Sequence, residues 1–116
     1  MQQTTESQFV GTWEGTMEQP GFRPFPVIIR LTEFQYGKWS GILQHPPPLD
    51  ADGRLLGIEL GDNTMVLAAT IFRGRERCLD GLSILRLLDE NTMERVWVDP
   101  STGEEGAKGR LLRVAT

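Results

Sequence analysis

The sequence predicts one small all-β domain, folded as an antiparallel up-and-down barrel of about eight strands. Short segments alternate apolar and polar residues with a period of two, turn-forming residues separate them at regular spacing, and no segment sustains a helical period. The 116 residues suffice for one domain, and 39% hydrophobic with 24% charged residues is an ordinary globular composition. We expect residues 8–116 to form the barrel and residues 1–7 to be a disordered lead-in.

Four strands are predicted in the first half of the chain. Their spans are 9–18, 25–32, 38–44 and 54–60. In the first strand, Trp13 and Met17 share one face, whereas charged and hydroxyl residues occupy the other, which is the pattern of a half-buried strand. Two prolines and a glycine mark a loop at 19–24, and Tyr36 with Gly37 makes a tight connection between the second and third strands.

Four more strands are predicted in the second half, at 65–72, 76–88, 93–99 and 108–115. Residues 61–64 have the composition of a hairpin turn, residues 89–92 form another turn, and a bulge at Asp80 and Gly81 would interrupt the sixth strand. An open sheet of this length leaves two unpaired edges, and closure into a barrel pairs both. A two-sheet sandwich is the competing architecture.

The charge and the cysteine content restrict the partners and the compartment. A formal net charge of −4 has the wrong sign for a nucleic-acid or anionic-membrane binder, so we expect neither partner. Cys78 is the single cysteine, and residues 1–8 lack the apolar run of a signal peptide, which together favour a cytoplasmic protein. Arg73, Arg75 and Arg77 form either a solvated hairpin tip or a patch for a phosphate or carboxylate at the barrel mouth.

The first strand carries a short recognisable sequence, Gly11-Thr12-Trp13. This resembles the Gly-x-Trp motif that opens the calycin barrels, the superfamily of lipocalins, fatty-acid-binding proteins and avidin-like proteins. The resemblance implies a barrel in which Trp13 plugs one end and an arginine from the last strand, Arg113 or Arg110, lies across the indole ring. A guanidinium over an indole face gains about 1 kcal/mol or more when it is desolvated.

A barrel of this size predicts a binding function. Its interior is just wide enough to be filled by side chains or to hold one small ligand. Our leading hypothesis is a lipocalin-like, non-catalytic protein that holds a small, largely apolar molecule in the lumen. The candidate lumen residues are Trp13, Ile29, Tyr36, Trp39, Leu43, Ile58, Leu67 and Trp97. Tyr36 or an arginine at the mouth would orient a polar group; on the seventh strand, Arg95 with Trp97 and Val96 with Val98 compete for the interior.

The middle strands suggest an alternative function. Residues 65–72 are apolar on both faces and residues 82–88 nearly so, which would leave an apolar patch outside the barrel. The alternative hypothesis is therefore a homodimeric interaction or structural module with a filled core, associating through strands around 54–88. A third hypothesis is an enzyme that uses a barrel-mouth carboxylate, Asp80 or Glu59.

No cofactor or metal is expected. The sequence contains no phosphate loop, zinc-ligand spacing, dinucleotide fingerprint or nucleophile elbow. His45 is the only histidine, and neither it nor Cys78 has the sequence neighbours that a metal or catalytic site requires.

Overall fold

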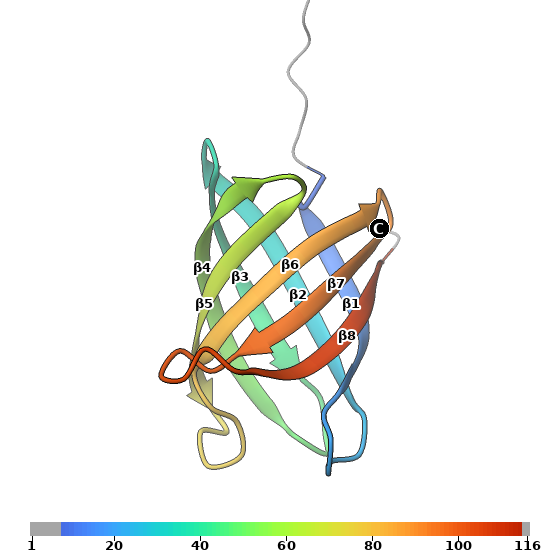
Figure 1. Cartoon of the computed structure of the whole chain (residues 1–116), viewed down its shortest axis with the longest axis vertical. Coiled ribbons are helices and arrows are strands. Elements are labelled where there is room, and N and C mark those ends of the chain that lie inside the picture. The colour runs from blue at the N-terminus through green and yellow to red at the C-terminus, as the bar shows by residue number, and fades with distance from the viewer. Residues whose placement is uncertain (1–7, 115–116) are drawn as a thin grey trace, which may run out of the picture.

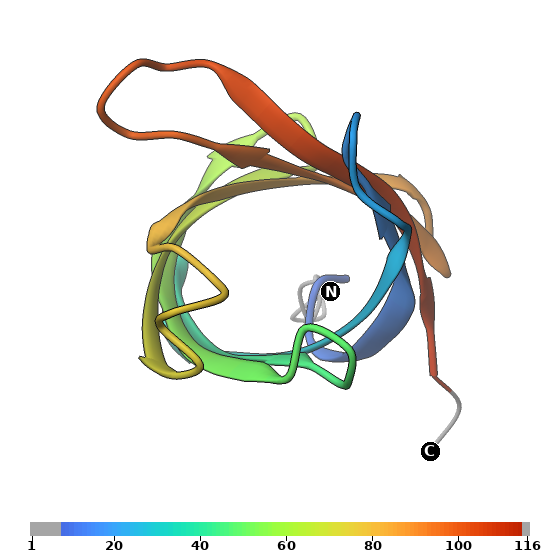
Figure 2. The ribbon, with the colours of Figure 1, turned by 90° about the horizontal axis from the view of Figure 1, so that it is seen from below.

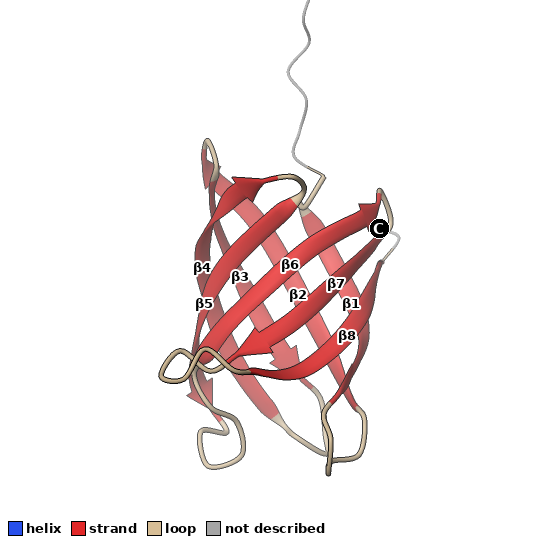
Figure 3. Cartoon of the chain, in the orientation of Figure 1, coloured by secondary structure: helices blue, strands red, loops and turns tan. Residues whose placement is uncertain are grey.

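The computed structural model describes residues 8–114, which form one closed barrel of eight antiparallel strands in sequence order (Figures 1 and 3). The strands are β1 Gly11–Glu18, β2 Phe25–Gln35, β3 Lys38–His45, β4 Ala51–Gly61, β5 Thr64–Arg73, β6 Gly81–Asp89, β7 Thr92–Val98 and β8 Glu105–Arg113. This confirms the predicted up-and-down barrel over the sandwich. The expected lead-in at 1–7 lies outside the described residues. In the described part of the chain, no helix has the length and apolarity needed to span a bilayer.

Closure depends on the pairing of the first strand with the last. β8 runs antiparallel to β1 with Trp13 opposite Arg113 and Met17 opposite Gly109, so both sheet edges are satisfied. The strong curvature also requires close approaches between strands. A Cβ atom built on Gly57 of β4 would lie 1.9 Å from the carbonyl oxygen of Val66 on β5, so only glycine fits there.

The two ends of the barrel are built differently. At one end, two-residue turns join β2 to β3, β4 to β5 and β6 to β7. Asp62 and Asn63 both have positive φ, 50° and 58°, as a hairpin turn that follows the strand twist requires. At the opposite end lie the longer connections, residues 19–24, 46–50, 74–80 and 99–104. Figure 2 views the barrel from this end.

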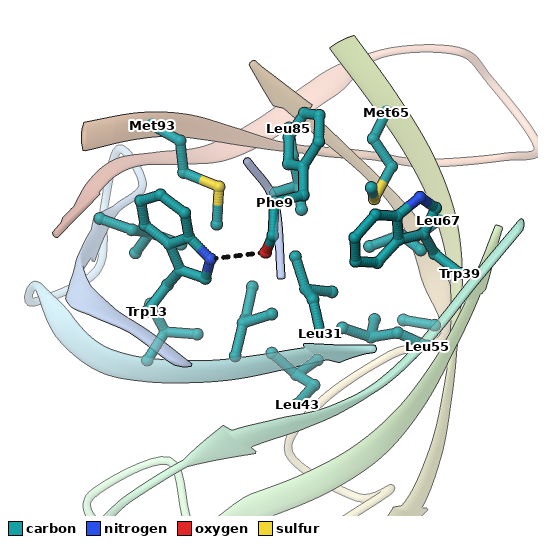
Figure 4. Close-up of a cluster of buried hydrophobic side chains, with 14 of the residues drawn as sticks. Phe9, Trp13, Leu31, Trp39, Leu43, Leu55, Met65, Leu67, Leu85 and Met93 are labelled. Carbon is teal, nitrogen blue, oxygen red and sulfur yellow. Dashed lines mark hydrogen bonds between the residues drawn. The ribbon is translucent and has the colours of Figure 1, made fainter. Parts of the chain in front are cut away.

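The end with the short turns is filled by the hydrophobic core (Figure 4). Trp13 and Trp39 are fully buried there, and Phe9 packs edge-on against Trp39 with ring centroids 6.1 Å apart. Both indole N–H groups have partners: Trp13 Nε1 donates to the Phe9 carbonyl at 3.0 Å, and Trp39 Nε1 donates to Glu59 Oε1 at 2.8 Å. We therefore call this the closed end and the other the open end.

Several predicted strand boundaries differ from the structure: β2 extends to Gln35, β4 begins at Ala51 and β8 begins at Glu105, and the largest difference concerns the sixth strand. The sequence predicts a sixth strand from residue 76, but β6 begins at Gly81. The preceding residues form a loop because the backbone N–H groups of Arg77 and Cys78 both donate to the Gly74 carbonyl, at 2.9 and 3.0 Å. Gly74 has a φ of 83°, which bends the chain away from the ladder. This loop replaces the predicted bulge.

Candidate functional site

A cavity of about 550 Å³ occupies the open end of the barrel. All four long connections and the adjoining strand ends contribute to it. Its lining residues are Gln19, Phe22, Arg23, Phe25, Leu43, His45, Pro48, Leu49, Ala69, Arg77, Cys78, Leu79, Arg95, Trp97, Asp99 and Ala107. A mostly apolar lining with a few polar groups, at a volume between roughly 300 and 1,000 Å³, is typical of small-molecule sites.

Trp97 on β7 forms one wall of this cavity, and glycines on both neighbouring strands make room for it. A Cβ atom on Gly81 of β6 would lie 2.2 Å from Trp97 Nε1, and one on Gly106 of β8 would lie 2.7 Å from Trp97 Cε3. Because neither glycine has a side chain, the indole lies flat against β6 and β8. The space of the cavity next to the indole therefore stays free.

Arg95, two residues before Trp97 on β7, is the most unusual residue of the site. It is only 2% exposed, and its Nε donates to Ser83 Oγ at 3.1 Å. Burial lowers the pKa of the guanidinium to about 10. No carboxylate of the described residues pairs with it, so a buried positive charge lines the cavity without a counter-ion.

His45, the last residue of β3, is also buried in the lining, at 3% exposure. Its Nδ1 lies 3.1 Å from the Pro26 carbonyl oxygen and its ring packs edge-on against Phe25. Burial, followed by the charge of Arg95, lowers the pKa of His45 to about 4, so the ring is neutral at pH 7. Because a carbonyl oxygen only accepts, Nδ1 carries the proton and Nε2 remains an acceptor.

Cys78, in the β5–β6 loop, also lines the cavity. It is half-buried and reduced, and burial raises the pKa of its thiol. A raised pKa keeps the thiol protonated and weakly nucleophilic at neutral pH. The inner part of the cavity thus has one cation, one neutral acceptor and one thiol beside apolar side chains, while Gln19, Arg23, Arg77 and Asp99 lie on the loops or strand ends around it.

The arginine cluster predicted from the sequence proves to be a network of surface ion pairs. Arg73 bonds to Asp52 at 2.6 Å and to Asp50 at 3.0 Å, and Arg75 bonds to Asp80 at 2.9 Å. Their charges are thus balanced within the loops. The cluster holds the β5–β6 loop on the rim of the mouth, which favours its structural interpretation.

Arg77 has a second role in this network. Its Nε and Nη2 donate to the carbonyl oxygens of Leu49 and Asp50, at 2.7 and 2.6 Å, and it also bonds to Glu76. It therefore fixes the β3–β4 loop against the β5–β6 loop. Because its donors are engaged, it contributes to the shape of the cavity rim more than to ligand binding.

The predicted lumen residues separate into three groups. Leu43 and Trp97 line the cavity. The residues fully buried within the core instead of lining the cavity are Trp13, Ile29, Trp39 and Leu67. Tyr36 and Ile58 were expected inside, and both placements are wrong: Tyr36 is fully exposed in the β2–β3 turn, and Ile58 is 50% exposed.

The error at Ile58 comes from the strand's two apolar faces. On β4, Leu56 and Ile58 alternate with Leu55 and Gly57, so the pattern alone gives no unique inner face. The close approach of Gly57 to β5 turns Leu55 inward and Ile58 outward.

The structure places Arg113 over the indole of Trp13, with Cζ 4.3 Å from the ring centroid. Its Nε donates to the Glu90 carbonyl at 3.0 Å and its Nη1 to the Val10 carbonyl at 2.6 Å, while Nη2 bonds to the Gln8 carbonyl. Arg110, the other arginine considered for this position, is exposed on β8.

Neither predicted acid stands free in the cavity. Glu59 accepts the Trp39 hydrogen bond, and Asp80 accepts hydrogen bonds from the Ile71 N–H at 2.8 Å and from Arg75. These donors lower the pKa of Asp80, the opposite of what a neutral general acid needs. Over residues 8–114, no group of three or more His, Cys, Asp or Glu side chains could hold a metal ion.

Comparisons with known proteins identify the fold but no family. No family model matches the chain, and no curated protein does. Among solved structures, the chain is similar to a redesigned β-barrel, with 14% identity, a TM-score of 0.78 and 93% of each chain covered. It is also similar to a de novo designed fluorescence-activating β-barrel, with 10% identity, a TM-score of 0.70 and coverage of 92% and 94%.

A third similar structure is that of EF1p2_mFAP2b bound to DFHBI. It shares 12% identity with this chain at a TM-score of 0.74, over 92% of this chain and 94% of that one. At such identities the likeness extends to the barrel alone.

Sequence reasoning missed His45 and Cys78 as lining residues and left the direction of Arg95 open. No local sequence motif relates these three residues to one another. The barrel brings them to one cavity from β3, the β5–β6 loop and β7. The signal available was the period of β7: Met93 is buried, so Arg95 shares its inward face.

Proposed function

We propose that this protein is a non-catalytic binding protein that holds a small, largely apolar molecule in the open-end cavity. The observation that carries the proposal is the division of the barrel into a filled end and an open end. The core occupies the closed end, while about 550 Å³ beside Leu43, Trp97 and Ala107 is left free at the other. A preformed apolar cavity binds by burying apolar ligand surface without a large reorganisation of the protein.

We further propose a relationship to the calycin barrels. It is supported by the position of Gly11-Thr12-Trp13 at the start of β1 and by the stacking of Arg113 on Trp13 at the closed end. The similar barrel that is bound to DFHBI supports the idea that this architecture can hold a small molecule.

The test of binding is a titration with N-phenylnaphthylamine, a neutral apolar probe, followed by its own fluorescence and by native mass spectrometry. We expect saturation at one probe per chain. Trp97 lines the cavity whereas Trp39 lies in the core, so Trp97→Phe should reduce the energy transfer from protein to probe. Alkylation of Cys78 with a bulky maleimide should block the site. An unsaturable or absent response would contradict the proposal.

A second candidate function, a homodimeric interaction module, is favoured by the outer surface. Ile58, Val66, Ile84 and Val96 are register partners across β4 to β7, and the neighbouring row is formed by Leu56, Ala68, Leu82 and Val98. We call these two rows the outer apolar face. Leu56 is 60% exposed there. Contiguous exposed apolar surface of this kind usually marks an interface.

The occupant that we propose for the outer apolar face is a second copy of this chain. The face is bordered by charges of both signs, with Arg86 bonded to Glu94 at 2.6 Å and Lys108 bonded to Glu105 at 3.0 Å. A border of mixed charge suits an isologous two-fold contact, in which each charge can meet its opposite on the partner. This interface and the open-end cavity occupy different parts of the barrel, so the two functions are compatible.

A further inference from the structure

The buried guanidinium of Arg95 is unexplained by the packing of the barrel. Buried charges in proteins are normally paired with an opposite charge, because the loss of hydration is otherwise uncompensated. Here the only side-chain partner within residues 8–114 is the Ser83 hydroxyl, whose oxygen accepts a hydrogen bond from Nε. The titratable side chains that interact electrostatically with it, His45 and Cys78, are held neutral by burial. Asp99, the carboxylate in the cavity lining, accepts hydrogen bonds from Ser101.

The two terminal nitrogens of Arg95 face the cavity. Neither Nη1 nor Nη2 has a hydrogen-bond partner among the described residues. Every fully buried side-chain nitrogen or oxygen in that part of the chain does have a partner, so Nη1 and Nη2 are not fully buried. These nitrogens are therefore reached from the cavity that Arg95 lines. The bond from Nε to Ser83 fixes the plane of the guanidinium and leaves four N–H donors for a ligand.

We propose that Arg95 binds the carboxylate of the ligand, and that the natural ligand is a small apolar carboxylic acid, bound as its monoanion. This inference rests on the proposed binding function and names the class of molecule. The planar guanidinium can engage both carboxylate oxygens, while Trp97, Leu43 and Phe25 contact the apolar body.

The charge of the site favours a carboxylate over a phosphate. One guanidinium balances one negative charge, whereas a phosphate monoester carries between about −1.5 and −2 at pH 7. The excess charge would remain buried beside a neutral histidine and a neutral thiol. Of the other arginines in the lining, Arg77 is engaged by backbone carbonyls, and Arg23 lies exposed at the mouth.

The mouth itself suits an apolar acid. Phe22 and Leu79, on two different loops, are 67% and 68% exposed at the rim of the cavity. Large apolar side chains in such positions provide contact surface for the part of a ligand that extends out of the lumen. The buried charge of Arg95 and the exposed apolar side chains of Phe22 and Leu79 favour a ligand that binds with its carboxylate inward.

The experiment compares three probes of one shape by isothermal titration calorimetry at pH 7: naphthoate, naphthalenemethanol and naphthyl phosphate. They are titrated into the wild-type protein, Arg95→Met, Arg95→Lys and Arg30→Met. Arg30→Met is the matched control because Arg30 is an exposed residue on the outside of β2. Far-ultraviolet circular dichroism checks that each variant retains the barrel.

We expect Arg95→Met to weaken naphthoate binding by about 10- to 100-fold, the range for a charge-assisted hydrogen-bonded pair, and Arg95→Lys to give a smaller loss. Binding of naphthalenemethanol should change by less than about threefold, and Arg30→Met should match the wild type for every probe. Equal naphthoate affinity in wild type and Arg95→Met, or tighter binding of the phosphate, would overturn the inference.

The outcomes also separate this inference from the proposed function. If N-phenylnaphthylamine binds but naphthoate shows no preference over the alcohol, the cavity is a binding site and the carboxylate inference is wrong. If neither the neutral probe nor any naphthyl compound binds, the proposed function is wrong as well.

Discussion

At the scale of single residues, the site is made of groups that are costly to the folded protein. Arg95 and His45 are both almost fully buried, and burial shifts the pKa of each in the direction that disfavours its charged form. Arg95 stays charged because its pKa remains well above neutral pH. His45 is neutral at pH 7 because its pKa is lowered to about 4. The charged Arg95 is therefore suited to binding an anion, and the neutral His45 is suited to accepting a hydrogen bond.

Replacing Arg95 with methionine should stabilise the empty protein. The charge is buried without a carboxylate, so an apolar side chain of similar length removes a desolvation cost and retains the packing. We expect the free energy of unfolding at pH 7 to rise by about 1–3 kcal/mol, measured by urea denaturation. Arg30→Met, which removes an exposed charge, should change it by no more than about 0.5 kcal/mol. Destabilisation by Arg95→Met would show that the guanidinium has a structural role.

His45 should make the protein less stable as the pH falls. Its pKa is about 4 in the folded protein and 6.5 in the unfolded chain, so the unfolded chain binds the proton first. The stability contribution is complete above pH 6.5 and is lost between pH 6.5 and 4, by up to about 3 kcal/mol. Carboxyl groups titrate in the same range, but they cancel in the difference between wild type and His45→Gln. A pH-independent difference would mean that the pKa of His45 is the same in the folded and unfolded states, and would contradict this prediction.

The groups that surround His45 account for the lowering of its pKa. The charge of Arg95 and burial both oppose protonation, whereas the Pro26 carbonyl and Asp52 favour it more weakly. A bound carboxylate would offset the charge of Arg95. Ligand binding is therefore expected to raise the pKa of His45.

At the scale of elements, strands β4 to β7 use both of their faces. Leu55 and Leu67 point into the core, while Leu56 and Ile84 belong to the outer apolar face. A barrel strand in contact with solvent would alternate apolar and polar residues. The second apolar face is the reason for which we propose a second copy of this chain as the partner at this surface.

Ile84→Lys should prevent association through the outer apolar face. Ile84 lies in the middle of its row, between Val66 on β5 and Val96 on β7, so a lysine would place an unpaired charge inside the contact. We expect sedimentation velocity to give a dimer for the wild type and a monomer for Ile84→Lys. Thr32→Lys, on the exposed outer side of β2, is the control and should remain dimeric. A monomeric wild type would exclude this interface.

At the scale of the whole molecule, the barrel is asymmetric along its axis. Short turns, two tryptophans and the Arg113 contact seal one end, and the four long connections surround the cavity at the other. The sealed end contains the hydrophobic core, and the open end contains the cavity. A packed scaffold with binding residues on the loops at one end is a common division in binding proteins.

Removing the Arg113 contact should weaken closure of the barrel without altering the cavity. Arg113 stacks on Trp13 and bonds to backbone carbonyls at Gln8, Val10 and Glu90, so it ties the last strand to both the start of β1 and the β6–β7 turn. We expect Arg113→Met to lower the free energy of unfolding by about 2–3 kcal/mol. Arg110→Met should cost less than about 0.5 kcal/mol because that side chain is exposed on the outside of β8. Equal losses in the two variants would contradict a specific closing role.

The sequence by itself determined the fold class, because the alternation of side chains and the chemistry of the turns are local properties. Residues 61–64 specify a hairpin turn, and Trp13 with Met17 marks an inward face, wherever the chain is placed. The pattern also indicated the second apolar face of the middle strands.

Only the tertiary structure decided which faces and residues form the site. On β4 both faces are apolar, so the inward choice of Leu55 over Ile58 depended on the close approach of Gly57 to β5. Arg95 and His45 are separated by many residues along the chain, and no local pattern relates them. Their shared cavity exists because closing the sheet brings β3 and β7 to opposite sides of one small lumen, a long-range relation that no period along the sequence records.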